Sequence, residues 1–436
     1  MLLRFAYALL WTLALPLALA RLYWRARRQP AYAAHVGERF GRYAPQPGGP
    51  TLWVHAVSVG ETRAAEPLIR AMRKRWPAHR IVLTAMTPTG RDTARALFGT
   101  DPAITLAYLP YDHPFLVDRF LRHFSPDFGV VMETELWPAL LQACAASGRP
   151  VMLANARLSE RSARGYARWP ALTRATLGAL AAIGCQTDDD GRRLAALGAS
   201  RVTTTGNIKF DISPPSAQLA LAQQFRARLG GRHAVLLASA RDGEEAMLLD
   251  ALPPTAQRRG IVWVIVPRHP QRFDEVARLV VAHGLHLCRR SDNEAVGDAD
   301  VWLGDSMGEM FAYYAACDVA LIGGSWLPFG GQNLIEPCAV GTPVLVGPHT
   351  FNFAQVAEQA VDAGAALRAA DLPQAVVLAT ALLDDTSRRE TMSVRGRAFA
   401  RRHAGATERT MAVLEAVVAP PHELRTRPSA EPRHSR

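Results

Sequence analysis

Cysteine is scarce in this chain of 436 residues. Its five cysteines are far apart, odd in number and without a C-x-x-C pair. This spacing excludes a disulfide framework and argues against a zinc site. We therefore predict a chain of a reducing compartment whose cysteines are small buried residues: Cys144, Cys185, Cys288, Cys317 and Cys338.

Two common nucleotide-binding motifs are also missing. The sequence has no Walker A motif and no G-x-G-x-x-G after an expected strand. A P-loop NTPase or an ordinary nicotinamide-dependent enzyme would carry one of them. These two classes of enzyme are therefore disfavoured.

Positive charge is concentrated at the two ends of the chain, whose net charge is +11. Residues 1–28 contain five arginines and no acid, and residues 419–436 have an excess of two positive charges. The body between them has no clear basic face interleaved with aromatic residues, which is typical of nucleic-acid binding. We therefore expect no nucleic-acid partner.

An apolar run near the N-terminus, Phe5 to Ala20, has no charged residue. It is slightly shorter than the roughly 20 residues of a bilayer span, but Tyr23, Trp24 and nearby arginines can extend it by snorkelling. A cleaved signal peptide is the alternative, because residues 18–20 resemble a cleavage site. The arginines that follow favour a cytoplasmic position for the rest of the chain. We predict an uncleaved membrane anchor over residues 1–28, in contact with membrane lipids.

From residue 50 onward, short apolar runs alternate with segments of helical spacing. The runs are continuous, which is typical of parallel strands buried on both faces. A polar stretch with two prolines, residues 210–218, separates two series of such runs. The expected strands are 51–57, 80–86, 103–110, 128–134, 150–156 and 183–187, then 234–240, 261–267, 300–304, 318–325 and 343–347.

This pattern predicts an α/β fold with two doubly wound, Rossmann-like domains. The predicted domains are 29–212 and 213–419, followed by a tail, 420–436, whose composition indicates disorder. Ligands bind such sheets at the carboxyl ends of the strands, and two facing domains leave a cleft.

Acidic residues follow two expected strands of the first domain. Glu61 ends the first strand region in "HAVSVGET" (55–62), and Glu133 and Glu135 lie in "METELWP" (132–138). Because the carboxyl ends of parallel strands meet at one edge, we expect these acids to share a site. The alternatives are that Glu61 complements a helix N-terminus and that the other two lie in a solvated loop.

Three stretches of the second domain are candidates for binding an anion. The glycine-rich stretch 323–347 contains a helix expected to start near Asn333, where free amides can hold a phosphate and Glu336 can accept hydrogen bonds from ribose hydroxyls. Arg268 and His269 follow strand 261–267, and "GDSMGE" (304–309) precedes another helix. The alternatives are ordinary turns and helix starts.

The acidic triplet 188–190 and the rare lysines complete the candidates. The triplet follows a strand and precedes a helix, which favours acidic N-capping over a metal site. Among 50 basic residues only Lys74 and Lys209 are lysines. Lys209 lies beside the expected linker, where a compact ammonium group can be required. The alternative is that lysine occurs at this position by chance.

Taken together, ten motifs between about residues 20 and 355 resemble the 3-deoxy-D-manno-octulosonic acid (Kdo) transferases of Gram-negative bacteria. The match is specific and covers most of the chain. These are the basic N-terminal anchor, "HAVSVGET", "TPTG" (87–90), "METELWP", "NARLS" (155–159), "GNIKFD" (206–211), "VPRHP" (266–270), "GDSMGE", "GGQNLIEP" (330–337) and "GPHTFNF" (347–353).

The resemblance implies an inverting glycosyltransferase of GT-B architecture. It would move Kdo from CMP-Kdo to the lipid A precursor, lipid IVA, at the cytoplasmic face of the inner membrane, without a cofactor or metal. It implies that Glu61 is the general base and that Glu133 and Lys209 stabilise charge. The implied CMP contacts are Arg268, His269, Met307, Gly308, Glu309, Asn333, Leu334, Ile335 and Glu336.

Two alternatives stay open at this point. One is a membrane-associated GT-B transferase that uses another nucleotide sugar. The other is a non-catalytic, membrane-anchored scaffold that binds a nucleotide or a lipid. Tolerance of a substitution at Glu61 would favour the scaffold.

Overall fold

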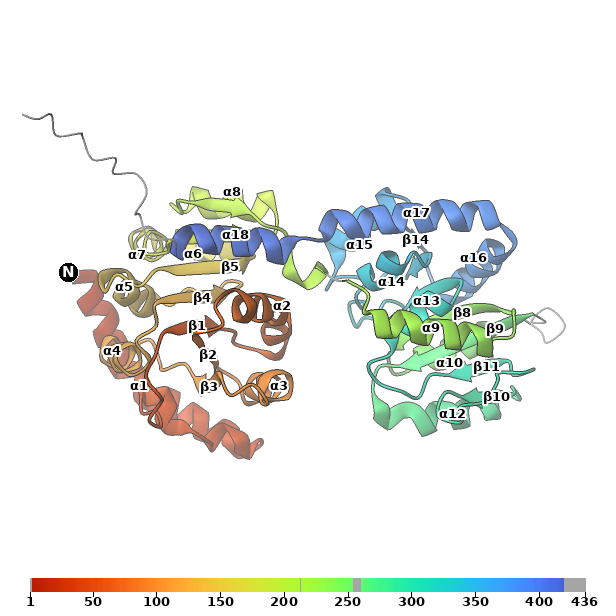
Figure 1. Cartoon of the computed structure of the whole chain (residues 1–436), viewed down its shortest axis with the longest axis horizontal. Helices are drawn as coiled ribbons and strands as arrows, with labels where there is room; N and C mark the ends of the chain where they lie inside the picture. Colours follow the sequence, from red (N-terminus) through yellow and green to blue (C-terminus); the bar gives the residue numbers. More distant parts are fainter. Residues whose placement is uncertain (1, 212, 254–259, 419–436) are drawn as a thin grey trace, which may run out of the picture. The chain divides into compact units, whose positions relative to one another are not determined.

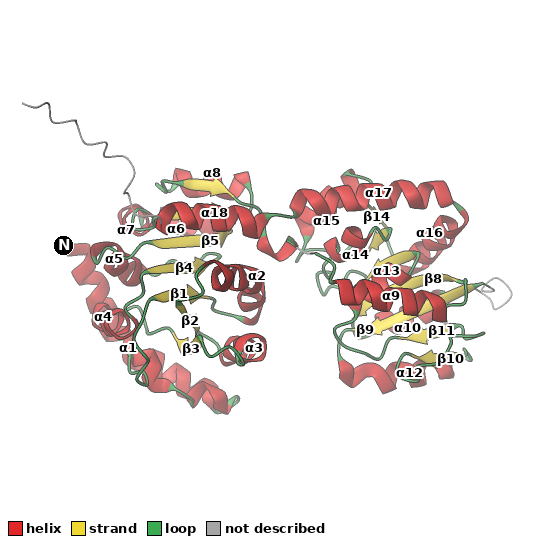
Figure 2. Cartoon of the chain, viewed as in Figure 1, coloured by secondary structure: helices red, strands yellow, loops and turns green. Residues whose placement is uncertain are grey.

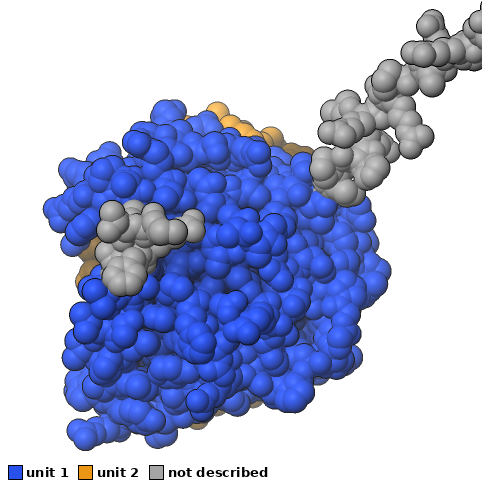
Figure 3. All heavy atoms as spheres, turned by 90° about the vertical axis from the view of Figure 1, so that its left-hand side faces the viewer, with its two compact units in different colours: residues 1–211, 405–436 blue, residues 212–404 orange. Residues whose placement is uncertain are grey.

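The computed structural model describes residues 2–211, 213–253 and 260–418. The chain divides into two compact units, which Figure 3 colours separately. Unit 1 comprises residues 1–211 and 405–436, and unit 2 comprises residues 212–404. Each unit is described by itself.

Unit 1 contains a sheet of seven parallel strands (Figure 2). The central strands are continuous apolar runs buried on both faces, as their sequences predict. The strand order is β3-β2-β1-β4-β5-β6-β7. The strands are β1 (Thr51–His55), β2 (Arg80–Ala85), β3 (Ile104–Tyr108), β4 (Phe128–Met132), β5 (Val151–Ala156), β6 (Ala182–Cys185) and β7 (Val202–Thr204).

Helices cover both faces of this sheet and form two hydrophobic cores (Figure 1). One core lies under α2, α3 and α18, and the other under α4 and α5. The helices are α1 (Leu2–Ala26), α2 (Val59–Arg75), α3 (Pro88–Phe98), α4 (Pro114–Phe124), α5 (Pro138–Ala146), α6 (Glu160–Ala167), α7 (Pro170–Leu177), α8 (Asp188–Ala196) and α18 (Ala406–Val418), with 3-10 turns η1 (Pro30–Ala33), η2 (Val36–Phe40) and η3 (Ile208–Phe210).

Unit 2 repeats the architecture with a second parallel sheet of seven strands, in the order β10-β11-β9-β8-β12-β13-β14. Its strands are β8 (His233–Ala240), β9 (Ile261–Pro267), β10 (Leu287–Arg289), β11 (Val301–Leu303), β12 (Val319–Ile322), β13 (Val344–Val346) and β14 (Ala366–Arg368). Its helices are α9 (Ser216–Arg228), α10 (Glu244–Ala251), η4 (Pro270–Arg272), α12 (Phe273–Ala282), α13 (Met310–Ala316), α14 (Ile335–Val340), α15 (Ala354–Asp362), α16 (Leu372–Asp384) and α17 (Thr386–His403).

The predicted fold class, two doubly wound Rossmann-like domains, is confirmed. The units divide after residue 211, inside the predicted linker. The expected cleft stays a prediction. The predicted tail, 420–436, lies outside the described residues.

The predicted C-terminal limit of the second domain, residue 419, is wrong. Helix α18 belongs to unit 1, where Leu414 is fully buried in the core under α2. Asp211 holds the chain where it re-enters unit 1 after unit 2. Its carboxylate accepts hydrogen bonds from the amides of Gly405 and Thr407, both at 2.7 Å. Burial of the apolar face of α18 therefore decides which unit the helix joins.

Helix α1 contains the predicted anchor. Its segment from Tyr7 to Ala26 has 20 residues and a mean hydropathy of 1.3, so it is long and apolar enough to cross a membrane. A signal sequence satisfies the same criteria of length and composition. The anchor therefore agrees with the structure but is not established by it.

Candidate active site

The carboxyl edge of the unit 1 sheet brings the predicted acids together. Strands β1 and β4 are neighbours in the sheet, with His55 paired to Val131. Glu61 lies in the first turn of α2, six residues after β1 ends at His55, and Glu133 directly follows β4. The charges of Glu133 and Glu135 act on the Glu61 carboxylate and raise its pKa. The three acids therefore lie close together at this edge, and their shared catalytic site stays a prediction.

The Glu61 side chain is held by a capping box at the start of α2. The Ser58 hydroxyl caps the helix by accepting a hydrogen bond from the Glu61 amide at 3.5 Å. In return the carboxylate accepts hydrogen bonds from the Val57 amide at 2.7 Å and from the Ser58 hydroxyl at 3.1 Å. Glu61 therefore does complement the N-terminus of α2, which is the alternative role that the sequence left open. The same bonds fix the carboxylate in one position.

The "TPTG" motif supports this turn from behind. The Val57 carbonyl accepts hydrogen bonds from the Thr87 hydroxyl at 3.2 Å and from the Met86 amide at 3.2 Å. A Cβ at Gly90 would lie 3.0 Å from the Val57 carbonyl oxygen. Glycine at this position therefore permits the close approach of α3 that keeps the Glu61 turn in place.

The pKa of Glu61 is raised to about 7. Burial is the largest cause, since it removes water from the charged form, and the charges of Glu133 and Glu135 add to it. The hydrogen bonds from Val57 and Ser58 act in the opposite direction. A carboxylate with this pKa can both accept and release a proton near neutral pH.

Glu133 and Lys209 form the ion pair that joins two loops of the site. The Lys209 Nζ lies 2.5 Å from the Glu133 Oε1, and the two side chains are 39% and 21% exposed. The Glu133 backbone has φ of 58°, and its amide donates a hydrogen bond to the Ala154 carbonyl at 2.9 Å. A left-handed backbone is uncommon for a residue other than glycine, which indicates that the loop is firmly determined by its surroundings.

A set of side-chain amides holds the Lys209 turn. The Ile208 amide donates to the Asn155 Oδ1 at 3.0 Å, and the Lys209 amide donates to the Asn207 Oδ1 at 3.0 Å. Gln186 connects the two, because it donates to the Asn155 carbonyl and accepts from the Asn207 side chain, each at 3.0 Å. Asn155 is fully buried and has φ of 55°. These amides were missed by sequence reasoning, although "NARLS" and "GNIKFD" contain two of them.

Two further groups near the site have structural explanations. His55 is fully buried, its Nδ1 lies 2.9 Å from the Thr84 hydroxyl, and burial lowers its pKa to about 3. It is therefore neutral and serves the core. The acidic triplet 188–190 forms the first turn of α8 behind its cap Thr187, as N-capping predicts.

In unit 2, Arg268 and Glu336 lie close enough to interact. Arg268 directly follows β9, and its charge lowers the pKa of Glu336. Burial is the larger influence and raises that pKa to about 7, while the Asn333 side chain donates a hydrogen bond to Glu336 at 3.4 Å. His269 follows Arg268 and precedes η4. Arg268, Asn333 and Glu336 therefore lie together, while a role of this group and of His269 in binding CMP stays a prediction.

The other predicted CMP contacts of unit 2 differ in how far they are exposed. Helix α14 begins at Ile335, two residues after Asn333, as predicted, and the side chains of Leu334 and Ile335 are each 1% exposed. They can therefore offer a ligand little more than backbone groups. Met307 is 54% exposed, and Gly308 has φ of 80°.

The carboxylate of Glu309 is already engaged. It forms two hydrogen bonds with the Arg290 guanidinium, at 3.0 and 3.1 Å, and accepts a third from the Ser306 hydroxyl at 2.6 Å. Residues 304–308 have the G-x-S-x-G spacing of serine hydrolases. The Ser306 hydroxyl, however, contacts Glu309 and the Tyr313 hydroxyl, and no histidine contact to it is found in the described part of the chain. A nucleophilic serine is therefore not indicated.

Glu244 supports the glycine-rich loop and was missed by sequence reasoning. It is fully buried, and its carboxylate accepts hydrogen bonds from the amides of Gly324 at 2.7 Å, Arg241 at 2.8 Å and Trp326 at 3.0 Å. No motif indicates this role, because two of the three amides come from a segment about 80 positions away.

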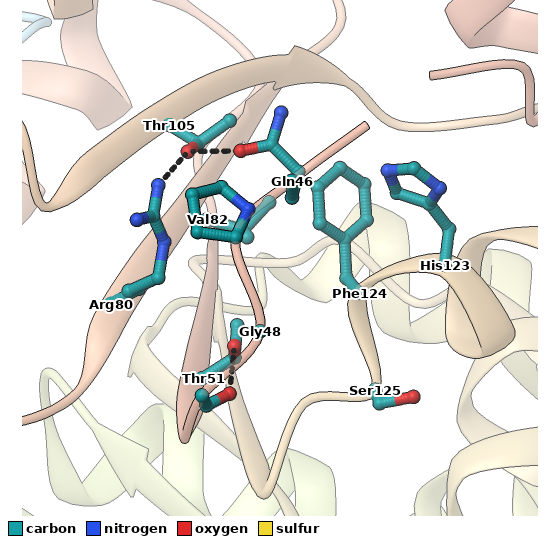
Figure 4. A pocket seen from close by; sticks show the side chains of 11 residues that line it. Gln46, Gly48, Thr51, Arg80, Val82, Thr105, His123, Phe124 and Ser125 are labelled. Atoms are coloured by element: carbon teal, nitrogen blue, oxygen red, sulfur yellow. Dashed lines mark hydrogen bonds between the residues drawn. The ribbon is translucent and has the colours of Figure 1, made fainter. Parts of the chain in front are cut away.

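A pocket of about 210 Å³ lies at the opposite, amino edge of the unit 1 sheet (Figure 4). There the Thr105 hydroxyl contacts both Arg80, at 3.4 Å, and Gln46, at 3.0 Å. Parallel sheets bind ligands at the carboxyl edge, so this pocket is not assigned to the site. Its lining residues are Gln46, Pro47, Gly48, Gly49, Thr51, Arg80, Val82, Thr105, His123, Phe124 and Ser125.

Comparisons with known proteins agree with the sequence resemblance. Residues 34–212 match the family model described as 3-deoxy-D-manno-octulosonic-acid transferase (kdotransferase). The chain is 45% identical to a 3-deoxy-D-manno-octulosonic acid transferase of Bordetella pertussis, over 93% of this chain and 98% of that one. It is 34% identical to the enzyme of the same name from Haemophilus influenzae, over 94% and 98%.

The fold also matches solved structures of low sequence identity. A UDP-GlcNAc 2-epimerase from Neisseria meningitidis, solved with UDP-GlcNAc, is 18% identical, with a TM-score of 0.55, over 84% of this chain and 100% of that one. This likeness shows the fold alone. With the near-complete coverage of the two transferases above, the chain belongs to the 3-deoxy-D-manno-octulosonic acid (Kdo) transferases and is a glycosyltransferase.

Proposed function

We propose that this enzyme transfers Kdo from CMP-Kdo to the lipid A precursor, lipid IVA, in the inner core of lipopolysaccharide, with inversion at the anomeric carbon. The observation that carries the proposal is the Glu61 carboxylate, which has a pKa of about 7 and lies beside the Glu133–Lys209 pair. Its motif is the one that the family resemblance assigns to the base.

Glu61 is proposed to act on the acceptor. A sugar hydroxyl that attacks the anomeric carbon must lose its proton, and a carboxylate with a pKa near neutrality suits this step. Inversion by a single displacement needs no protein nucleophile. The capping box supports the role, because the Val57 amide and the Ser58 hydroxyl hold the carboxylate in one place.

The Glu133–Lys209 pair is proposed to stabilise charge. An ammonium group paired with one carboxylate still offers donors to an anionic sugar or phosphate. The amides of Asn155 and Asn207, which hold the Lys209 turn, support a positioned rather than a mobile lysine. Such preorganisation is what charge stabilisation in a transition state requires.

Unit 2 is proposed to bind the CMP moiety of the donor. Arg268 and His269 suit a phosphate, and Glu336, with a pKa raised to about 7, can exchange hydrogen bonds with ribose hydroxyls. Met307, Gly308, Glu309, Asn333, Leu334 and Ile335 stay as contacts implied by the family, the buried members through backbone groups. No cofactor or metal is proposed.

Helix α1 is proposed to anchor the enzyme to the inner membrane, with the body in the cytoplasm. Its length and apolar composition support an anchor, and Arg25, Arg27 and Arg28 follow its apolar segment. A lipid acceptor also requires the enzyme to work at a membrane surface.

Mass spectrometry of the lipid product tests this function. The full-length enzyme is incubated with lipid IVA and either CMP-Kdo or UDP-N-acetylglucosamine. We expect the lipid to gain Kdo only with CMP-Kdo, and Arg268→Ala to raise the KM for CMP-Kdo. An unmodified lipid with CMP-Kdo, or equal transfer from the UDP sugar, would contradict the proposed donor and acceptor.

A further inference from the structure

Helix α6 of unit 1 carries a stripe of arginines. Arg161 and Arg164 of α6 and Arg168, the residue that caps its C-terminus, follow one another at spacings of three and four residues, so they lie on one face. All three are exposed, and α6 has no buried residue. Their side chains form no salt bridge or hydrogen bond with any residue that the structure describes. The stripe is about 10 Å long at the rise of an α-helix.

Four other helices of this unit each carry an arginine that is paired with an acid three or four residues away. In α6, Glu160 lies four residues before Arg164, but no bond between the two is found among the described residues. Glu160 is the only acid from residue 151 to 187. Like charges at this spacing destabilise an isolated helix. The paired cases are Arg70–Glu66 in α2, Arg95–Asp92 in α3, Arg122–Asp118 in α4 and Arg192–Asp189 in α8.

The stripe points away from the body of the unit. The opposite side of α6 carries Ala163 and Tyr166, which pack against the core under α4 and α5. Directly after the stripe, Trp169 is 69% exposed. An outward row of positive charges beside an exposed tryptophan is the composition of a surface that meets lipid headgroups.

Helix α6 packs on the same core as α4, α5 and α7, and α1 runs beside α4 and α5 (Figure 1). The Tyr7 hydroxyl donates a hydrogen bond to the Asp112 carboxylate at 2.7 Å, and Asp112 also accepts from the Leu140 amide of α5 at 2.9 Å. Helix α5 in turn packs against α7, and α7 against α6. The α1 face turned to solvent is apolar, with Leu9, Leu10, Leu13 and Leu17 between 50% and 72% exposed.

We propose that Arg161, Arg164 and Arg168 of α6 dock unit 1 on an anionic phospholipid leaflet, beside the apolar face of α1. The inference builds on the membrane location proposed above. The leaflet fits better than a single phosphorylated ligand, because the stripe is extended and faces outward. The arginines supply the charge-dependent part of binding, and the α1 leucines supply the apolar part.

Vesicle sedimentation of the full-length enzyme tests the proposal. Binding is compared between vesicles of phosphatidylcholine alone and mixed vesicles that contain phosphatidylglycerol. For the triple variant Arg161→Gln, Arg164→Gln and Arg168→Gln, we expect affinity for the mixed vesicles to fall by roughly ten-fold or more, while binding to phosphatidylcholine stays unchanged.

The control variant is Arg70→Gln, Arg75→Gln and Arg95→Gln, which removes the same charge from exposed, paired positions on the α2 and α3 side. It should bind both kinds of vesicle like the wild type. Equal binding of the α6 triple variant and the wild type to mixed vesicles would overturn the proposal. Unchanged vesicle binding with a raised KM for lipid IVA would do the same, and would assign the arginines to the acceptor instead. The sedimentation result does not depend on whether CMP-Kdo is the donor.

Discussion

Glu61 has two tasks that use the same carboxylate. It completes the capping box of α2, and it is the proposed base of Kdo transfer. The tasks are compatible, because a carboxylate has about four acceptor positions and the capping box occupies two of them. Its neighbours Glu133 and Glu135 keep the proton available near neutral pH.

The charges of Glu133 and Glu135 contribute to the pKa of Glu61, and this pKa sets the pH of the acid limb of the pH–rate profile. The pKa of about 7 predicts that kcat/KM for Kdo transfer rises with pH through about 7, as Glu61 loses its proton. Glu135→Gln removes one like charge, so it should move this limb to lower pH by roughly half a unit. Asp118→Asn, in an exposed pair of α4, should leave the limb in place. A profile that Glu135→Gln does not move would contradict the coupling.

Sequence reasoning succeeded for residues whose position depends on strand order and failed for those defined by distant backbone groups. Glu61 and Glu133 follow strands, so their meeting at one edge could be predicted. Glu244 could not, because its role depends on the amides of residues 324–326. The burial of Leu334 and Ile335 was also not readable from the glycine-rich motif.

At the scale of elements, the loops at the carboxyl edge are fixed by positive-φ residues and amide side chains. Asn155 combines both features at the end of β5 and holds the Lys209 turn. Such a residue cannot be replaced without a loss of either backbone geometry or hydrogen bonding.

Two substitutions at Asn155 separate these contributions. Both Asn155→Gly and Asn155→Ala remove the acceptor of the Ile208 amide, so both should lower kcat for Kdo transfer, by roughly ten-fold, through a displaced Lys209. Only glycine adopts the left-handed backbone without strain. Denaturant unfolding should therefore find the alanine variant less stable than the glycine variant by about 1 kcal/mol. The reverse order of stability would contradict the account.

The strands show why part of the sheets could be predicted. Strands β1 and β9 are long apolar runs that are buried along their whole length, and a continuous apolar run predicts such burial. Strands β7, β10 and β14 were missed. Each has three residues, lies at the edge of its sheet, and is only partly buried or carries polar side chains, so neither periodicity nor hydrophobicity marks it.

At the scale of the whole molecule, two separate segments of the chain form unit 1. The apolar face of α18 is visible in the sequence, but the pattern does not say which sheet it covers. The contacts with Asp211 and the core under α2 decide this. The stability of unit 1 therefore depends on residues that follow unit 2 in the chain.

Hydrogen exchange measured by mass spectrometry tests this dependence. Leu414→Ala, at a fully buried position of α18, should destabilise unit 1 by about 3 kcal/mol and speed exchange in β1, β2 and β4. Leu383→Ala, buried in α16, is the matched change in unit 2 and should speed exchange in β8 and β9 instead. Faster exchange in β8 and β9 for Leu414→Ala would contradict the assignment of α18.

The rate of Kdo transfer from CMP-Kdo to lipid IVA by Glu61→Gln tests the central claim most directly. Glutamine keeps the size of the side chain and an acceptor for the Val57 amide, and it removes a partly buried charge, so the variant should unfold at no lower temperature than the wild type. With folding intact, we predict that kcat falls by at least about 100-fold at every pH, while the KM for CMP-Kdo changes little. A folded Glu61→Gln enzyme that transfers Kdo at the wild-type rate would show that Glu61 serves only the capping box.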